Sequence, residues 1–464
     1  MSREAVTAMK ILVLNGSPKG EVSVTMQYVV YLKKRFPEHS FETVSVAHEI
    51  KKIERDPAQF SAILGKVRSA DLVLWAFPLY YMLVCAQYKR FVELVFERDA
   101  QDAFSGKYAA ALSTSIHYFD QTAHAYIRAV SEDLGMQYLG GYSAAMMDLL
   151  EETERLRFEK FTSLIFAAIK EKIPVQRVNP PLVPTDLVYA PNQEQKRTDS
   201  GTQKVVILTD DDGGSPNLTA MRERIRAAFT GPVETINLRE LDIRGGCLGC
   251  CQCGYDNTCV YTDGYVDFYT KKLAPADIIV MAGSLHDRYL SSAWKQFFDR
   301  SFFKGHVPGL PGKQIGFVIA GPLAQVPHLR EILSAWADSS GSQAFFVTDE
   351  VASSPELDGL LDTMATRLVQ GAEAGYIPPR TFYATGGHKI FRDGICGPMK
   401  LVFQADYRYY KSHRMLDFPQ ADLKTRLANA ILIPLTRIPG FRKKVFADMK
   451  YHMVAPFKAV LGDS

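Results

Sequence analysis

Short apolar runs alternate with longer stretches of helical periodicity over most of the chain. The apolar run Ile11–Leu14 is followed by 25–36, where apolar side chains recur every three or four residues. Wholly apolar short strands that alternate with helices are typical of a parallel sheet covered by helices on both faces. The pattern therefore predicts an α/β fold of the doubly wound class.

The same pattern occurs twice. Residues 77–93 read FPLYYMLVCAQYKRFVE, and residues 283–299 read GSLHDRYLSSAWKQFFD, an offset of 206 positions. The first strands of the two copies, Ile11–Leu14 and Val205–Leu208, are related by an offset of only 194. The second copy therefore holds 12 additional residues early in its sequence, and a cluster of cysteines lies in that interval. We interpret the repeat as a duplicated domain with a cysteine loop in copy two only.

The repeat sets the expected domain boundaries. The first domain spans 1–172 and the second spans 204–379. Between them, 173–203 has the composition of a linker, with five prolines and a polar run. Residues 380–464 form a mostly helical, basic C-terminal segment.

Charge is unevenly distributed along the 464 residues. The net charge is +3, but residues 380–464 carry fifteen Lys and Arg against six Asp and Glu. A basic tail on an acidic body suggests an anionic surface or partner, while no nucleic-acid partner is expected. The sequence shows no signal peptide and no apolar stretch long enough to cross a membrane, so a cytoplasmic location is expected. In that compartment, clustered cysteines indicate metal ligands or redox groups rather than disulfides.

A loop with phosphate-binding chemistry follows the first strand. It reads Asn15-Gly16-Ser17-Pro18-Lys19-Gly20, and Ser23-Val24-Thr25 then opens a helix. Backbone N–H groups, hydroxyls and a helix N-terminus can all bind a phosphate here, and Lys19 can add a full positive charge. The same residue types also suit a plain strand-to-helix turn.

Three loops of the first copy, in sequence order, resemble those of the NADPH-dependent FMN reductase and iron–sulfur flavoprotein families. The first loop resembles the LNGSPR-type phosphate loop. The second, at 77–82, resembles the SPVYW-type loop beside the flavin ring, and the third, at 113–117, resembles the loop that closes over the flavin, with Ser115-Ile116 in place of a Gly pair. The resemblance implies tandem flavodoxin-like domains with FMN in the first. The implied FMN-binding residues are Ser17, Pro18, Lys19, Ser23, Val24, Thr25, Pro78, Leu79, Tyr80, Tyr81, Met82, Thr114, Ser115 and His117.

Copy two has lost these features. At the place of the phosphate loop it reads Thr209-Asp210-Asp211-Asp212-Gly213-Gly214-Ser215. Carboxylates repel a phosphate dianion, so FMN is not expected to bind there in the usual way. A shifted loop at 213–219 is the alternative.

Five of the seven cysteines lie between Cys247 and Cys259. Cys247, Cys250, Cys253 and Cys259 have the spacing C-x2-C-x2-C-x5-C, which lets thiolates of one loop converge on a cluster. The spacing resembles the compact motif of the iron–sulfur flavoproteins, and that resemblance implies a [4Fe–4S] cluster on these four residues. A zinc site and redox-active thiols remain alternatives, and Cys251 is the spare thiol of the loop.

These features predict a flavin-dependent oxidoreductase that passes electrons between a [4Fe–4S] cluster and FMN to reduce a small-molecule acceptor. NAD(P)H and ferredoxin are alternative donors, and an oligomer is compatible with the sequence. His117 and Tyr80 are the catalytic candidates, with His117 and Tyr118 considered for proton delivery. The alternatives are a non-enzymatic electron carrier, a redox sensor, and an NAD(P)H-dependent FMN or quinone reductase with structural zinc or redox thiols.

Apolar residues recur at helical spacing over 441–461, with basic residues on other faces. Such a helix can lie on an anionic lipid surface or can dock on the protein body, and Pro456 is expected to kink or end it.

Overall fold

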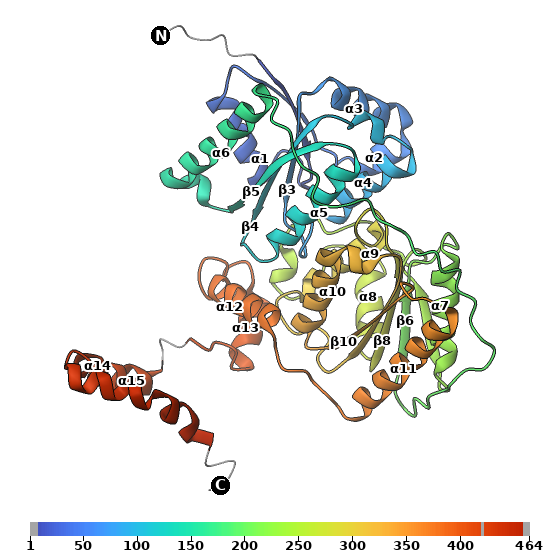
Figure 1. Cartoon of the computed structure of the whole chain (residues 1–464), viewed down its shortest axis with the longest axis vertical. Coiled ribbons are helices and arrows are strands. Elements are labelled where there is room, and N and C mark those ends of the chain that lie inside the picture. Colours follow the sequence, from blue (N-terminus) through green and yellow to red (C-terminus); the bar gives the residue numbers. More distant parts are fainter. Residues whose placement is uncertain (1–7, 419–421, 458–464) are drawn as a thin grey trace. The chain divides into compact units, whose positions relative to one another are not determined.

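The structure is a computed structural model that describes residues 8–418 and 422–457. The chain forms two compact units, Met1–Arg408 and Tyr409–Ser464. The first unit contains two five-stranded parallel sheets (Figure 1). None of the helices in the described part of the chain combines the length and the apolar character that a membrane crossing requires.

The first sheet has the strand order β2-β1-β3-β4-β5. Its strands are β1 (Lys10–Asn15), β2 (Ser40–Val44), β3 (Leu72–Pro78), β4 (Tyr108–Ser115) and β5 (Gln137–Ala145). Its helices are α1 (Val24–Arg35), α2 (Ile50–Arg55), α3 (Pro57–Ser69), α4 (Ala86–Glu97), α5 (Asp120–Asp133) and α6 (Glu152–Lys170). Alternate residues of β1 face opposite sides: Ile11 packs in the same core as α1 and α6, and Leu12 in the core with α3, α4 and α5.

The second sheet repeats this order, since β10-β9-β8-β6-β7 read from the other edge is β7-β6-β8-β9-β10. Its strands are β6 (Val205–Thr209), β7 (Val233–Asn237), β8 (Ile278–Ser284), β9 (Gln314–Ala320) and β10 (Gln343–Thr348). Its helices are α7 (Pro216–Ala228), α8 (Tyr265–Phe268), α9 (Ser292–Arg300), α10 (Pro327–Ser340) and α11 (Ser354–Glu373). The two doubly wound sheets and the helical C-terminal region confirm the predicted fold class.

The two domains meet through their equivalent helices. α4 packs against α9 and α5 against α10, between the two sheets (Figure 1). One continuous cluster of buried apolar residues includes Leu14 and Phe91 from the first domain and Leu208 and Phe297 from the second. The duplicated chain thus packs as a pseudo-dimer whose interface is a shared hydrophobic core.

The C-terminal segment divides between the two units. Helix α12 (Phe382–Cys396) packs on α10, and α13 spans Gln404–Ser412. In the second unit, α14 (Leu423–Leu435) and α15 (Pro439–Val454) are followed by a 3-10 turn, Ala455–Phe457. The helix expected over 441–461 therefore ends before Pro456, while 458–461 lie outside the described residues.

Candidate flavin and thiol site

The three loops singled out in the first copy lie together at the carboxyl ends of β1, β3 and β4. Thr114 joins them. Its hydroxyl lies 2.6 Å from the Thr25 hydroxyl of the first loop, and its carbonyl accepts a hydrogen bond from Leu79 N of the second at 3.1 Å. In doubly wound folds, ligands bind beyond this edge of the sheet, so the three loops form one candidate site.

The first loop is built for close approach of a phosphate. A Cβ on Gly16 would lie 2.8 Å from Tyr88 and 2.9 Å from Phe77, so only glycine fits there. Ser17 and Thr25 are fully buried, and Ser23 caps α1 by accepting from Met26 N at 3.3 Å. Met26 N is used by this cap, so the N–H groups of Val24 and Thr25 are the ones of the first turn that remain available to an anion.

The second loop is a tight turn in an uncommon backbone conformation. Tyr81 and Met82 have φ values of 42° and 67°, and Tyr80 and Leu83 exchange backbone hydrogen bonds of 2.8 and 3.1 Å. Thr122 of α5 donates to Met82 O at 2.6 Å. Left-handed residues other than glycine persist where their surroundings hold them, and they are enriched at functional sites.

The two tyrosines of this loop point to different parts of the second domain. Burial raises the pKa of Tyr81, while hydrogen bonds with Ser301 and Trp336 act against that shift, so this ring packs within the interdomain core. Tyr80 instead meets the cysteine loop, where a Cβ on Gly249 would lie 1.8 Å from the Tyr80 hydroxyl oxygen. Burial also raises the pKa of Tyr80, and nearby Cys247 adds to the effect. The Tyr81 ring is thus taken up by the interdomain core, whereas the Tyr80 hydroxyl reaches the cysteine loop.

The third loop places His117 at the head of a polar chain. His117 is half exposed, has φ of 58°, and its Nδ1 lies 2.9 Å from Asp120 Oδ2. Tyr118, the other proton-delivery candidate, instead donates to Tyr383 O at 2.8 Å, and its pKa is raised to about 12, mainly by burial. This hydroxyl anchors the C-terminal segment to the first domain.

The polar chain continues inward from Asp120 to the buried His124. Ser143 Oγ donates to Asp120 Oδ2 at 2.6 Å, and Ser113 Oγ donates to Ser143 Oγ at 3.3 Å. Ser113 Oγ also lies 2.8 Å from His124 Nε2. Burial lowers the pKa of His124, whereas His117 and Ser143 hold the pKa of Asp120 below its usual range although burial acts to raise it. These hydrogen bonds connect the exposed imidazole of His117 to the buried, neutral imidazole of His124.

The cysteine loop lies between β7 and α8 and is held by a buried ion pair. Arg300 bonds both carboxylate oxygens of Asp263, at 2.7 and 2.8 Å, and donates to Gly245 O at 3.0 Å. Gly249 and Cys251 have φ values of 62° and 58°, which produce tight turns within the loop. Paired, planar hydrogen bonding of this kind fixes the start and the end of the loop relative to α9.

The five thiols of the loop line one pocket. Arg300 lines it as well, and its Nε has no hydrogen-bond partner although the side chain is buried. Among residues 8–418 and 422–457, no three His, Cys, Asp or Glu side chains are arranged to hold a metal ion. The donor set and the unpartnered guanidinium N–H suit a thiolate-bound cluster by their chemistry, while the thiols as placed do not share a coordination point.

The cysteine loop also contacts the first domain. Gln87 Nε2 donates to Cys247 O at 3.2 Å, and Lys51 Nζ donates to Arg244 O at 2.6 Å. Lys19 of the first loop lies close enough to lower the pKa of Cys251, which burial raises overall. The thiols of one domain and the phosphate and ring loops of the other are therefore neighbours.

The equivalent loop of the second domain is already filled by its own side chains. Thr219, the counterpart of Thr25, donates to the Asp211 carboxylate at 2.7 Å. Asp210 stands where the first domain has Gly16, and it accepts hydrogen bonds from Ser291 and from Trp294 Nε1. Burial raises the pKa of Asp210. The Asp211 carboxylate, which is bonded to Thr219 at the start of α7, would repel a phosphate at this place.

The fold and the three loops define a flavodoxin-like domain of the flavin-dependent oxidoreductase class. Residues 9–149 match the family described as NADPH-dependent FMN reductase. The glycine-lined first loop, the helix N-terminus beside it and the buried hydroxyls of Ser17 and Thr25 fit the phosphate end of FMN. No curated protein sequence matches the chain.

Several solved structures are similar to part of the chain. An NADH:FMN oxidoreductase, EMOB, is 16% identical, with 36% of this chain and 92% of that chain covered and a TM-score of 0.30. FerB of Paracoccus denitrificans, a flavoenzyme NAD(P)H:(acceptor) oxidoreductase, is 17% identical, with 35% and 98% covered and a TM-score of 0.31. An NAD(P)H:quinone oxidoreductase of Methanothermobacter marburgensis is 12% identical, with 37% and 100% covered and a TM-score of 0.26.

Sequence reasoning missed the residues that act through long-range partners. Asp120, Ser143 and His124 belong to the polar chain, and Arg300 anchors the cysteine loop. The repeat itself contained one signal for the interdomain contacts, because Lys89 and Lys295 occupy equivalent positions and each is followed four residues later by a carboxylate, Glu93 or Asp299.

Proposed function

We propose that this protein is an FMN-dependent oxidoreductase in which a [4Fe–4S] cluster, held by Cys247, Cys250, Cys253 and Cys259, exchanges electrons with FMN held by the first domain. A small molecule would be the final acceptor. The observation that carries the proposal is the contact between the Tyr80 hydroxyl and Gly249, which joins the flavin-ring loop to the cysteine loop.

When bound, FMN can accept a hydride from a nicotinamide and pass single electrons on, and a cluster can relay single electrons. The chain would supply the geometry. Ser17, Thr25 and the start of α1 would hold the phosphate, and the turn at 80–83 would fix the ring. Tyr80 would lie between the ring loop and the cysteine loop, and Arg300 would offset negative charge on the thiolates.

Proton delivery would fall to His117. It is the exposed end of the chain that continues through Asp120, Ser143 and Ser113, and general acids commonly work through such an oriented imidazole. Asp120 would hold the ring orientation, and the inner members would keep Asp120 ionised. His124, buried and neutral, would end the chain without competing for the proton.

The matching family is described as NADPH-dependent, which supports NADPH as the donor. Ferredoxin is the alternative donor, and the thiol loop would then receive its electrons. Clustered thiols also suit the reducing cytoplasm, where we place the protein.

Anaerobic purification followed by assays of FMN, iron, sulfide and zinc tests the proposal. We expect one FMN and about four irons per chain, as one cubane cluster requires. The variants C247S, C250S, C253S and C259S should each lose iron, while C251S, in the same loop, should retain it. If the protein contains FMN and zinc but no iron, the cysteines hold a structural zinc ion rather than a cluster.

FMN without any metal would leave a flavin reductase with redox thiols. Neither FMN nor metal would end the proposal. Turnover with NADPH and an artificial acceptor separates an enzyme from a simple electron carrier, since a carrier exchanges electrons with partner proteins but shows no saturable reduction of the acceptor.

A further inference from the structure

The second compact unit carries a large exposed apolar surface that the proposed function does not use. On α14, Leu423, Leu427, Ile431 and Leu435 follow one another at four-residue intervals, so they share one face of the helix. Their exposed fractions lie between 38 and 73%. Single exposed leucines are ordinary, but a whole helix face of them marks an interaction surface.

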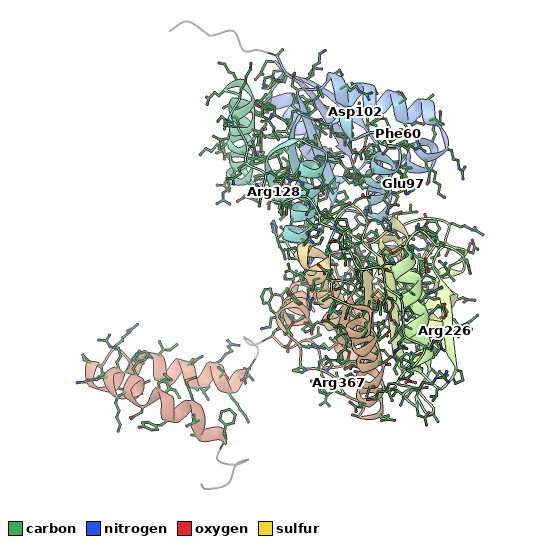
Figure 2. All side chains as sticks on the ribbon, turned by 45° about the vertical axis from the view of Figure 1, so that its right-hand side comes forward. Phe60, Glu97, Asp102, Arg128, Arg226 and Arg367 are labelled. Carbon is green, nitrogen blue, oxygen red and sulfur yellow. The ribbon has the colours of Figure 1, made fainter. Side chains whose placement is uncertain are left out.

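Helix α15 shows a second exposed row. Phe446, Met449 and Met453 recur at three- and four-residue intervals, and Phe457 follows in the next turn. Phe446 and Met453 are 66 and 67% exposed, and Phe457 is 58% exposed. Figure 2 shows side chains that project from both helices.

Positive charge accompanies this apolar surface. Residues 422–457 contain seven lysines and arginines against two aspartates. Three of the cations, Arg442, Lys443 and Lys444, are consecutive on α15, and all three are exposed. Exposed leucine, phenylalanine and methionine rows next to lysine and arginine are the combination that binds a bilayer whose headgroups are negatively charged.

We infer that α14 and α15 bind the surface of an anionic phospholipid membrane, with the apolar rows in the headgroup and acyl boundary and the basic residues on lipid phosphates. A second copy of the chain would satisfy the apolar rows, but it would bring like charges together. An apolar protein partner would leave the cations unused. The lipid surface satisfies both features.

Vesicle flotation with the full-length chain tests this inference. We expect binding to vesicles of phosphatidylcholine with 30% phosphatidylglycerol, a composition chosen as roughly that of an anionic membrane, and little binding to phosphatidylcholine alone. The variant R442Q/K443Q/K444Q should bind about tenfold or more weakly, because each cation near an anionic surface contributes to binding. A matched control is K33Q/K34Q/R35Q, which removes three consecutive cations from the end of α1.

The apolar rows need their own variant. L427S/I431S/F446S should weaken binding to anionic vesicles at least as strongly, whereas V22S/L164S, which removes exposed apolar side chains from the first domain, should not. Circular dichroism and thermal unfolding check that each variant is folded. No binding to anionic vesicles, or equal binding to neutral ones, overturns the inference. So does concentration-dependent dimerisation that L427S/I431S/F446S abolishes while vesicle binding is unchanged.

Discussion

The ammonium group of Lys295, on the second domain, donates a 2.9 Å hydrogen bond to the main-chain oxygen of Tyr80, in the flavin-ring loop of the first. The mirror contact exists as well, since Lys89 donates to His286 O at 3.1 Å. Both lysines are fully buried, and each pairs with a carboxylate one turn along its helix, Asp299 or Glu93. Each domain thus holds the equivalent loop of the other, and in our proposal only the loop of the first domain belongs to the flavin site.

Because the two loops differ in their proposed role, substitution of the two equivalent lysines should have different effects. K295M and K89M should each destabilise the chain by about 3–5 kcal/mol, because K295M leaves Asp299, and K89M leaves Asp287, without its cation. Only K295M should weaken FMN binding, by about tenfold or more, since it removes a charged hydrogen bond from the loop at Tyr80. Fluorescence titration with FMN, beside thermal unfolding, separates the two effects. Equal losses of FMN affinity would mean that Lys295 has no special relation to the flavin.

The paired carboxylates predict opposite pH dependences of stability. Burial raises the pKa of Asp299 to about 6, although Lys295 and Ala86 N oppose the shift. Between about pH 4 and pH 6 the folded chain therefore holds a proton that the unfolded chain has lost. The contribution of Asp299 to the free energy of unfolding is largest below pH 4 and falls as the pH rises through 6. Relative to D299N, the wild type should lose about 3 kcal/mol over that window.

Glu93 should behave in the reverse way. Burial acts to raise its pKa, but Lys89, Ser292 and Arg90 hold it below the ordinary value of 4.5. Its contribution is therefore present above pH 4.5 and lost as the pH falls through the lower value of the folded state. Urea unfolding of wild type, D299N and E93Q at several pH values measures both trends. If the two differences change in the same direction with pH, the account of this interface is wrong.

The polar chain behind His117 predicts graded losses of turnover. H117A should lower kcat by about 100-fold, as expected when a general acid is removed. S143A breaks the chain between Ser113 and Asp120 and should lower kcat by about three- to tenfold. Steady-state turnover with NADPH and its solvent isotope effect measure the change.

Ser131 provides the control for S143A. It is a fully buried serine on α5 whose hydroxyl donates to Ile127 O at 2.7 Å, outside the chain. S131A should leave turnover unchanged. A result in which S143A and S131A behave alike would remove the chain from the mechanism and leave it a structural feature.

The contact between Tyr80 and Gly249 predicts a steric coupling across the domains. G249A combines a left-handed backbone with a Cβ only 1.8 Å from the Tyr80 hydroxyl oxygen. G213A has a comparable backbone, with φ of 83°, and no atom within 4 Å of the new Cβ. Backbone strain costs about 1 kcal/mol in each variant, so G249A should be at least 1 kcal/mol less stable than G213A.

The coupling should disappear when Tyr80 is removed. In a Y80A background, G249A should cost about as much as G213A does, because only the backbone strain remains. Denaturant unfolding of the four variants gives the coupling free energy. Additive effects of G249A and Y80A would show that the two loops are not in contact.

Local patterns in the sequence predicted much of this architecture. The alternation of apolar runs and helical stretches predicted both sheets. The first loop of copy one was found from residue types that suit a phosphate, and the other two loops were found from their resemblance to the family. The carboxylates of 210–212 led to the expectation that copy two does not bind FMN in the usual way, and the structure adds that Thr219 donates a hydrogen bond to Asp211. These features depend on neighbours in sequence, which is why they are readable there.

Other features depend on partners about 200 residues away. Nothing near Tyr81 indicates that its ring packs against Ser301 and Trp336, and nothing near Lys295 indicates a bond to Tyr80. The contacts of the C-terminal segment were likewise not predictable from nearby residues. Helical spacing predicted a helix near 441–461, but not that α12 would join the domains through Tyr383, nor that the apolar rows of α14 and α15 would be exposed.

The division of labour between the two copies is tested most directly by titration of the flavin-free chain with FMN. The account predicts one FMN per chain. S17D, which gives the first loop the carboxylate found at the equivalent Asp211, should abolish binding, and D211N should leave it unchanged. Two FMN per chain, or binding that survives S17D and is lost in D211N, would contradict it.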